Sequence, residues 1–469
     1  MKISSFFLLL LIPALVAGCN WDLGYSELVD WTDGLFDSGG GGGHDGEEED
    51  EFQGDFLRFD KQINSFDDED SFAKEPDMAR SGNDTVVVWL EDRDGDGDKV
   101  FAAVTDKGTT TFNEENRIDS ADDIDNISAV KVAASGDNIT VVYFNATDLN
   151  VMAAASTDGG ETFIEAVQVN TDVIVGDISS DELFVCASGT NVYVMWQDPA
   201  NDPIFFRASD DVGATWHGAG ELEIDADAGG TPSSDPDMVC DGDNLYVTWT
   251  DTRDGNEDIY FAASTDGGES FDDEIRIDDG PGNTVSTVPA ICVEGDKIWI
   301  AWEDDRDGQD IFMNYSANAG GTFLGADVQV NKQVTASAPQ IACSDGYAFF
   351  AFTGDNGDLH IQRTKGPGSI FLTTDNRVEF NAFDHGSYFI SAHDELVYVA
   401  WADEDGLVYF NYSLKRGATF YSSEKRACET GAEVQPDSLK MITTATYVHL
   451  VWTDEQEADN SDIFYQKGK

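Results

Sequence analysis

Short apolar segments that end in a large aromatic residue recur along most of the chain. In the clearest example, apolar and polar positions alternate over 245–249, a polar stretch covers 251–258, and a second apolar run covers 259–263. Alternation with a period of two is typical of half-buried β-strands, and polar residues between two such runs indicate a turn. A short run precedes this pair at 237–240 and another follows at 274–277. The pattern predicts four antiparallel strands within about fifty residues.

This four-strand pattern repeats along the chain. The aromatic residue that ends the second strand stands at Trp89, Tyr143, Trp196, Trp249, Trp302, Phe352, Trp401 and Trp452. Successive spacings are 54, 53, 53, 53, 50, 49 and 51 residues. One such unit cannot bury its apolar faces alone, and units of this length stack around an axis. We therefore predict an all-β fold, a β-propeller of four-stranded antiparallel blades. The count gives eight blades, and seven is the alternative because the unit around Phe352 is degenerate.

The turn between the third and fourth strands has its own residue pattern, Ser-x-Asp-x-Gly-x-x-aromatic. It stands intact at Ser156, Asp158, Gly160 and Phe163, at Ser209, Asp211, Gly213 and Trp216, and at Ser264, Asp266, Gly268 and Phe271. Asn318 and Lys415 replace the aspartate in two later repeats, and 105–112 and 364–371 keep little beyond the final aromatic. The pattern resembles the Asp-box, or BNR repeat, of sialidases and related β-propellers, where it is structural. Serine and aspartate oxygens can accept hydrogen bonds from nearby backbone N–H groups, glycine permits a positive φ, and we expect the aromatic ring to pack into its own blade.

The two ends of the repeat region complement each other. The last unit stops after the run 462–466, one strand short. The segment 56–64 ends in Lys61-Gln-Ile-Asn64, which is similar to the fourth-strand segments 167–170 and 328–331. An unpaired sheet edge invites aggregation. We therefore predict that the N-terminal strand completes the last blade and closes the ring.

Residues before the repeats have a different character. The apolar run 6–17 follows Lys2 and ends in Val-Ala-Gly-Cys19, which is typical of a secretory signal and too short to span a bilayer. Its ending resembles the lipobox of bacterial lipoproteins, in which the cysteine is acylated; a plain signal peptide is the alternative. A glycine run at 39–43 and an acidic run at 47–51 predict a flexible, extended spacer.

These features predict three regions. A lipoprotein signal peptide covers 1–18, a lipidated Gly-rich and acidic tether covers 19–55 with Cys19 as the lipid attachment site, and the Asp-box propeller covers 56–469. The protein is then an exported bacterial lipoprotein of the outer membrane or cell surface, which contacts the membrane through its N-terminal lipid only.

The charge balance restricts the partners. There are 26 Lys and Arg residues against 92 Asp and Glu residues, a net charge of −66. Because such a charge repels polyanions, nucleic acid is excluded as a partner, and a glycan or a protein is left as the ligand.

Five cysteines follow Cys19, namely Cys186, Cys240, Cys292, Cys343 and Cys428. The first four recur nine or ten residues before the aromatic residue of the second strand. A chain of this length can bury an ample core without disulfides. We interpret the recurring cysteines as small buried apolar side chains, not as a disulfide framework.

The loops that follow the aromatic strands are acidic, at 91–98, 251–258, 303–310, 403–405 and 454–462. They join the second and third strands, so we expect them on the face opposite the Asp-boxes, as a ring of carboxylates. The first loop holds Asp92, Asp94, Asp96 and Asp98, and it resembles the opening of an EF-hand calcium loop. The twelfth position of that loop is Ala103 instead of glutamate, which excludes the EF-hand form. Calcium is a candidate cofactor, and a solvated acidic turn is the alternative.

Three of these loops share Arg-Asp-Gly, at Arg93, Arg253 and Arg306. The sialidase resemblance implies three arginines that clamp a carboxylate, a tyrosine nucleophile with a glutamate partner, and an acidic proton donor. The Arg-Ile-Pro run that carries the first of those arginines is absent, and the repeated arginines stand beside aspartates, which favours ion pairs within the loops. No catalytic residue is assigned. The sequence favours a surface-anchored, non-catalytic binding or scaffold propeller with an acidic, calcium-loaded face; an exo-sialidase or related glycoside hydrolase is the alternative.

Overall fold

The computed structural model describes residues between 61 and 468, with gaps at 65–71, 94, 107, 120–125, 173, 175, 200–202, 226–231, 281–283, 307, 333, 356, 367–374, 379–384, 404–405, 422–423, 429–437, 445 and 458–459. The predicted signal peptide, Cys19 and the tether lie outside the described residues. The described part consists of β-strands and a short 3₁₀ helix, η2 (Ser180–Glu182). It contains no helix with the length and apolar character needed to cross a membrane.

The strands form six four-stranded sheets and one eight-stranded sheet in the described part of the chain. The larger sheet has the order β30-β31-β32-β2-β3-β4-β5, with β1 beside β32. Its two halves meet through one parallel residue pair, Phe72 with Ser461, so it consists of two four-stranded units. We number the units 1 to 8 by their first strands. The described residues therefore hold seven connected sheets, and eight units when each half of the large sheet is counted.

Each unit uses its strands in sequence order. The first strands are β2 (Phe72–Ser81), β6 (Ile127–Ser135), β10 (Leu183–Ser188), β14 (Ser233–Asp241), β18 (Ser286–Glu294), β22 (Ala336–Ser344), β26 (His385–His393) and β30 (Lys440–Thr443). The second strands are β3 (Asp84–Asp92), β7 (Asn138–Asn145), β11 (Asn191–Gln197), β15 (Asn244–Asp251), β19 (Lys297–Asp304), β23 (Tyr347–Gly354), β27 (Leu396–Asp403) and β31 (Val448–Glu457).

The third and fourth strands complete each unit. The third strands are β4 (Lys99–Val104), β8 (Asn150–Ser156), β12 (Ile204–Ser209), β16 (Asp258–Ser264), β20 (Asp310–Ser316), β24 (Leu359–Lys365), β28 (Val408–Ser413) and β32 (Asn460–Gly468). The fourth strands are β5 (Asn116–Arg117), β9 (Val167–Gln168), β13 (Leu222–Glu223), β17 (Ile275–Arg276), β21 (Val328–Gln329), β25 (Asn376–Arg377), β29 (Lys425–Arg426) and, for unit 8, β1 (Lys61–Gln62).

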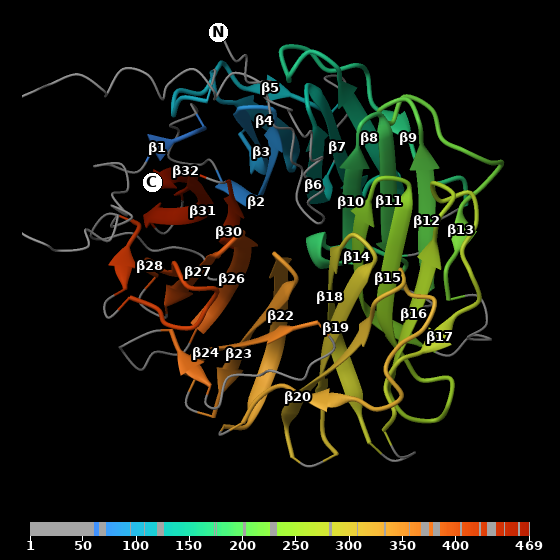
Figure 1. Cartoon of the computed structure of the whole chain (residues 1–469). Coiled ribbons are helices and arrows are strands. Elements are labelled where there is room, and N and C mark those ends of the chain that lie inside the picture. Colours follow the sequence, from blue (N-terminus) through green and yellow to red (C-terminus); the bar gives the residue numbers. More distant parts are fainter. Residues whose placement is uncertain are drawn as a thin grey trace, which may run out of the picture.

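The units are arranged in a ring. First strands of successive units contact each other from β2 through β6 and β10 onward, and β30 returns to β2. Figure 1 shows these strands nearest the centre, with the sheets radiating outward from them. The protein is an all-β β-propeller of four-stranded antiparallel blades, as predicted. The unit around Phe352, whose sequence left seven blades open, forms a complete four-stranded sheet, β22 to β25.

The core lies between neighbouring sheets. Every aromatic residue that ends a second strand is buried, with at most 3% of its surface exposed. The hydrophobic clusters combine residues of adjacent units, such as Val86 of unit 1 with Val141 of unit 2, or Tyr398 of unit 7 with Leu450 of unit 8. Since each sheet buries its faces against its neighbours, stability depends on a closed ring.

The N-terminal strand closes that ring. Lys61 pairs with Tyr465 on β32, and the Ile63 backbone N–H donates to the carbonyl oxygen of Ile463 at 2.8 Å. The Ile463 N–H in turn donates to Asn64 Oδ1 at 3.1 Å. In unit 2 the equivalent bond joins the Val151 N–H to Asn170 Oδ1 at 2.9 Å, so the last unit has the same fourth strand as the others. The closure prediction is confirmed for 61–64, and 56–60 lies outside the described residues.

The prediction of an acidic loop at 454–462 is wrong in part, because strands β31 and β32 both continue into this segment. Asp454 lies opposite Asp462 and Glu455 opposite Ser461 in the β31–β32 ladder. The pairing needs only backbone groups, so acidic side chains do not prevent it.

The interpretation of the cysteines as unpaired core residues is also wrong. Disulfides join Cys186 to Cys240 and Cys292 to Cys343. Each links the first strands of two adjacent units, where residues one repeat apart lie side by side with Cα atoms 6.2 and 6.0 Å apart, within the range that a disulfide needs. Cys428 stays outside both disulfides and is buried, and its Sγ accepts a hydrogen bond from the Val408 N–H at 3.1 Å.

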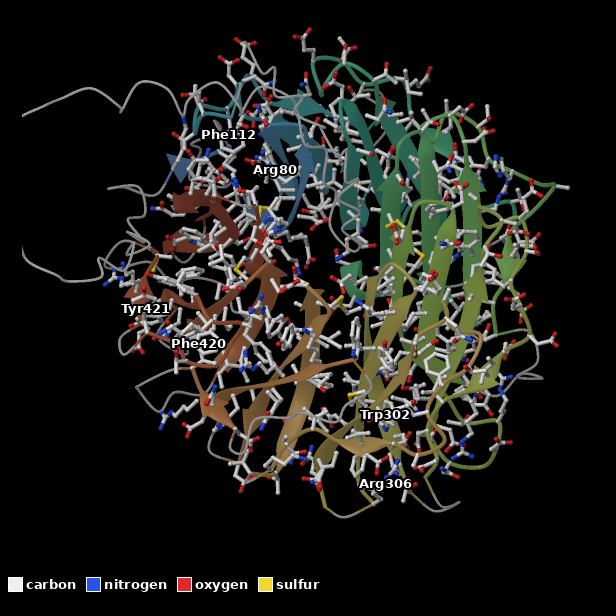
Figure 2. All side chains as sticks on the ribbon, in the orientation of Figure 1. Arg80, Phe112, Trp302, Arg306, Phe420 and Tyr421 are labelled. Atoms are coloured by element: carbon white, nitrogen blue, oxygen red, sulfur yellow. A yellow bond between two sulfur atoms is a disulfide. The ribbon has the colours of Figure 1, made fainter. Side chains whose placement is uncertain are left out.

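A buried histidine lies at the seam between units 8 and 1. His449 Nδ1 is 2.6 Å from Tyr465 Oη and 3.2 Å from Thr85 Oγ1, whereas its Nε2 has no partner among the described residues. Burial lowers the pKa of His449 well below its usual value, and the positive charges of Arg80 (Figure 2) and Lys467 lower it further. The folded protein therefore holds this histidine neutral.

We expect His449 to make stability pH-dependent on the acid side of neutrality. Below about pH 6.5 the unfolded chain binds a proton at this histidine that the folded chain does not, so folding stability falls as the pH decreases and is fully present above that value. In His449→Gln this contribution should vanish. Urea unfolding of both proteins at pH 7.5, 6.5 and 5.5 measures it, and parallel pH profiles for the two proteins would contradict the prediction.

Candidate functional site

The three loop arginines take part in one recurring set of contacts. In unit 4, Asp251 accepts a hydrogen bond from Trp249 Nε1 at 3.2 Å and forms an ion pair with Arg253 at 2.6 Å. Arg253 also pairs with Glu274, and its guanidinium carbon lies 4.3 Å from the centre of the Tyr260 ring. A carboxylate, an aromatic ring and a second carboxylate thus surround the arginine.

Units 1 and 5 repeat this arrangement. Arg93 pairs with Glu91 and Glu115, each at 2.7 Å, over the ring of Phe101. In unit 5, Asp304 accepts from Trp302 Nε1 at 3.3 Å and pairs with Arg306 at 2.6 Å. Figure 2 shows Arg306 farther toward the periphery of the ring than Trp302.

The predicted ion pairs within the loops are therefore confirmed. The side chains of Arg93, Arg253 and Arg306 are only 20%, 14% and 13% exposed, and each pairs with a carboxylate of its own unit. Arg306 also pairs with Asp279 of unit 4. Since units 1, 4 and 5 are not all adjacent, the structure does not bring these arginines together as one clamp.

Two buried carboxyl groups have raised pKa values, Asp327 beside Arg306 and Asp258 beside Arg276. Burial, together with a hydrogen bond to Asp279, raises the pKa of Asp327 to about 7, and the hydrogen bond from Asp327 lowers the pKa of Asp279. Burial and the charge of Asp278 raise the pKa of Asp258 to about 6. Such values suit a general acid. However, the side chains of Asp327 and Asp258 are 0% exposed, so a substrate oxygen could not reach them.

The first acidic loop is partly neutralised by lysines. Asp98 pairs with Lys74 at 2.8 Å, and Lys99 Nζ donates to the carbonyl oxygens of Gly97 at 3.0 Å and of Asp96 at 3.4 Å. Asp92 Oδ1 accepts the N–H of Gly95 at 2.8 Å.

These contacts bear on the predicted calcium site at Asp92, Asp94, Asp96 and Asp98. Asp94 lies outside the described residues, and the described residues contain no group of three or more metal-ligating side chains. A cation here would compete with Lys74 for Asp98 and with Lys99 for the carbonyl oxygens. Calcium binding at Asp94 and its neighbours stays a prediction, which a calcium titration by calorimetry would test.

The Asp-box residues form a closed hydrogen-bond network. In unit 2, Asp158 Oδ1 accepts from Ser156 Oγ at 2.7 Å and from the Thr162 N–H at 2.9 Å, while Ser156 Oγ accepts from the Gly160 N–H at 2.9 Å. The hydrogen bonds from Thr162 and then Ser156 lower the pKa of Asp158 to about 2. Boxes with the same serine-to-acceptor bond begin at Ser209, Ser264 and Ser316. In these four turns the serine and the acceptor side chain thus hydrogen-bond within the turn itself.

The box aromatic packs differently from the expectation. It contacts the preceding unit rather than only its own: Phe271 of unit 4 meets Phe206 of unit 3 edge-on, with ring centres 5.1 Å apart. Phe112 of unit 1, labelled in Figure 2, meets Tyr465 of unit 8 at 5.1 Å in the same way. The reason is that the turn projects beyond its sheet and meets the neighbouring one. Each box therefore connects two units.

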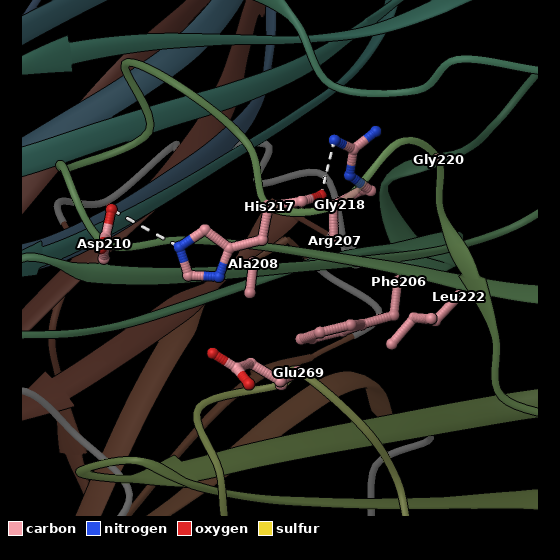
Figure 3. A pocket seen from close by; sticks show the side chains of 10 residues that line it. Phe206, Arg207, Ala208, Asp210, His217, Gly218, Gly220, Leu222 and Glu269 are labelled. Atoms are coloured by element: carbon pink, nitrogen blue, oxygen red, sulfur yellow. Dashed lines mark hydrogen bonds and ion pairs between the residues drawn. The ribbon is translucent and has the colours of Figure 1, made fainter.

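A pocket of about 450 Å³ lies between the boxes of units 3 and 4 (Figure 3). His217 lies on one side, with its Nε2 3.4 Å from an oxygen of Asp210, and Glu269 lies on the other. Phe206 and Leu222 supply the apolar part of the lining. This pocket offers carboxylates and an imidazole to a polar ligand.

Sequence reasoning missed this pocket although the repeat contained a signal for it. Asp210 and Glu269 occupy variable positions of two successive Asp-boxes, and His217 directly follows the aromatic of the first. Boxes of adjacent units lie side by side, so variable positions of neighbouring boxes can face one another. The sequence of a single box does not show which residues of the next box face it.

Comparisons with known proteins assign no family to this chain. No protein-family model matches this chain, and neither does any curated protein. Among solved structures, it is similar to the polysaccharide lyase Uly1, with a TM-score of 0.49 and 11% identity over 77% of this chain and 94% of that one. It is also similar to the β-propeller domain of the Trilobed protease from Pyrococcus furiosus, with a TM-score of 0.44 and 8% identity over 77% of this chain and 99% of that one.

A third similar structure is a mutant of Trypanosoma rangeli sialidase that displays trans-sialidase activity. The TM-score is 0.41 and the identity 10%, over 62% of this chain and 54% of that one, so this chain spans about half the length of the sialidase. Likenesses at such identities concern the β-propeller fold alone and carry no argument about activity.

Proposed function

We propose that this chain is a non-catalytic binding or scaffold propeller, held at a bacterial surface by a lipid on Cys19. One observation carries the non-catalytic part: the groups that resemble catalytic ones are buried in ion pairs. Arg93, Arg253 and Arg306 are each held in ion pairs, and Asp258 and Asp327, whose pKa values are raised, have no exposed side-chain surface. In these units the ion pairs stabilise the loops and leave no open cleft with a free clamp.

The binding surface in this proposal is the face opposite the Asp-boxes. Its loops end in exposed carboxylates such as those of Asp254, Asp279 and Asp305. A field of this sign attracts a protein or peptide with a basic surface and tolerates a neutral glycan, whereas it slows the approach of an anion. Calcium is the candidate small ligand of the same face, through the part of the first loop around Asp94.

The rival function is an exo-sialidase or a related glycoside hydrolase. The observation that favours it is the pocket of Figure 3, in which Asp210 and Glu269 could act on a neutral sugar with His217 beside them. Most glycosidases use a pair of Asp or Glu side chains as their catalytic groups. Here the pocket lies between two outer turns, and Arg93, Arg253 and Arg306 do not line it.

An activity assay on the mature protein separates the two functions. We expect no release of fluorophore from a 4-methylumbelliferyl sialoside or from a panel of neutral 4-methylumbelliferyl glycosides, because the three loop arginines are held in ion pairs and the carboxyl groups of Asp258 and Asp327 are buried. A commercial sialidase serves as the positive control. Turnover that disappears in Glu269→Gln or Asp210→Asn would overturn the proposal and assign the pocket as the active site.

A further inference from the structure

A group of cations stands out on the Asp-box side of units 6 and 7. Arg363, Lys365 and Arg416 surround the ring of Tyr347, with the guanidinium carbons 5.7 and 5.4 Å and the Lys365 ammonium 5.0 Å from its centre. Lys415 precedes Arg416 in the chain and is exposed. We refer to these five residues as the cationic cluster.

The fold holds this cluster in place. Tyr347 begins β23 and lies opposite Lys365 at the end of β24. Arg363 Nη1 donates to the carbonyl oxygen of Lys415 at 3.0 Å and to that of Arg416, which ties unit 6 to unit 7. The cluster is therefore built on strand ends and one fixed turn.

The charges of the cluster are only partly balanced. Arg416 pairs with Asp345 and Glu395, each at 2.6 Å. For Arg363, Lys365 and Lys415, the described residues provide no ion pair. The sequence explains why, since the segments 359–374 and 406–423 contain no Asp or Glu in a chain that has 92. Burial, and then the positive charge of Arg416, lower the pKa of Arg363.

The Asp-box of unit 7 differs from the intact boxes at this point. Lys415 takes the position at which Asp158 and Asp266 accept hydrogen bonds from the box serine and from the backbone. The turn keeps its form, because the Lys415 N–H still donates to Ser413 Oγ at 3.2 Å and Gly417 keeps a positive φ of 66°. The substitution thus replaces a negative charge by a positive one without changing the turn.

We propose that the cationic cluster binds a sulfate or carboxylate group carried by a carbohydrate, on the face opposite the acidic binding surface. Guanidinium and ammonium groups donate strong hydrogen bonds to oxyanions. The half-buried ring of Tyr347 supplies an apolar surface in their midst for the sugar ring that carries the charge.

The size of the cluster favours one charged sugar over a larger polyanion. Asp345, Asp394 and Glu395 lie on the turns beside it and confine the positive region. A nucleic acid strand is bound by a continuous basic groove with several stacking rings, and an anionic membrane by several unopposed basic residues. The net charge of −66 repels any long polyanion. At physiological salt, acidic residues farther than about 8 Å from the cluster are largely screened, so the local positive charge still attracts a single anionic group.

Titration calorimetry with a short dextran sulfate oligosaccharide tests the proposal. We expect the wild-type protein to bind this oligosaccharide and not to bind unsulfated dextran of the same length. In the double variant Lys365→Gln, Lys415→Gln, Kd should rise at least tenfold. Both lysines are exposed, so the thermal midpoint should stay unchanged, which separates lost binding from lost folding.

Lys332→Gln is the matched control, since Lys332 is an exposed lysine that follows the fourth strand at the other end of a sheet. It should bind as the wild type does. No binding by wild type, equal binding by the double variant, or tighter binding of a short DNA strand or of phosphatidylserine vesicles than of the sulfated sugar would overturn the proposal. None of these outcomes alters the fluorogenic assay above, so the two proposals fail independently.

Discussion

Asn64→Ala is expected to lower the free energy of unfolding by about 2–4 kcal/mol, because it removes buried hydrogen bonds from the ring closure. Asn64 is only 3% exposed. Its Oδ1 accepts the Ile463 N–H, and its Nδ2 donates to Asp462 at 2.9 Å and to Glu91 at 3.4 Å. One amide thus connects the N-terminal strand, unit 8 and unit 1. Urea unfolding at pH 7.5, followed by tryptophan fluorescence, measures the loss.

Asn64→Asp sharpens this test. Aspartate is the residue of other units at the same position, for example Asp278, where it accepts the Ile259 N–H at 2.9 Å. At the seam, however, a new carboxylate would stand beside Asp462 and Glu91, so we expect Asn64→Asp to unfold at lower urea than Asn64→Ala.

Asn170→Asp is the matched control for the seam. The Asn170 amide donates to the carbonyl of Asp172 and to Asn150 Oδ1, and a carboxylate there meets no such pair of acids. Its cost should stay at about 2 kcal/mol, the value of two ordinary hydrogen bonds. If Asn64→Asp were as stable as Asn170→Asp, the bridging role of Asn64 would be wrong.

The architecture was predictable because its signals are periodic. An aromatic residue at each second strand and a similar segment at the fourth strands recur one unit apart. Residues 61–64 resemble such a fourth-strand segment, so the sequence predicts that the N-terminal strand completes the last unit. Local sequence does not reveal contacts between units. The turn pattern therefore predicts that the Phe271 ring packs into its own blade, whereas the ring lies against Phe206 of the preceding one.

The disulfides are also contacts between units, and for them the cysteine spacings contain a signal. Cys186 and Cys292 precede their aromatic residues by ten positions, whereas Cys240 and Cys343 precede theirs by nine. This alternation follows the pairing: in each disulfide the first cysteine has the longer spacing and the second the shorter. The two cysteines that meet in each disulfide therefore differ by one residue in their position within the repeat.

The candidate site was predictable only where the chemistry is local. The ion pairs of Arg253 with Asp251 follow from a spacing of two residues and a single loop. Their second partners, such as Glu274, come from the far end of the unit and could not be chosen among so many acids. The cationic cluster combines two units, and the sequence marked it only by Lys415 and by the absence of acids around it.

Gly268→Ala is the second change for which we expect a large loss of stability, about 2–5 kcal/mol from backbone strain and overpacking together. Gly268 has φ +77°, a conformation that L side chains rarely adopt, and a Cβ there would stand 2.6 Å from Cε1 of Phe206 in the neighbouring unit. The box can connect two units closely only because this position lacks a side chain.

Gly267→Ala separates the two causes, because Gly267 has a similar φ of +74° but only the Tyr193 hydroxyl oxygen near its Cβ direction, at 4.0 Å. It should lose only the backbone part, about 1–2 kcal/mol. The smaller side chain in Phe206→Leu should recover part of the loss when combined with Gly268→Ala, although it costs stability alone. The thermal unfolding midpoints of Gly268→Ala, Gly267→Ala, Phe206→Leu and the combined variant distinguish backbone strain from the close contact with Phe206. Equal midpoints for the two glycine variants would mean that the box does not hold adjacent units in contact through Gly268.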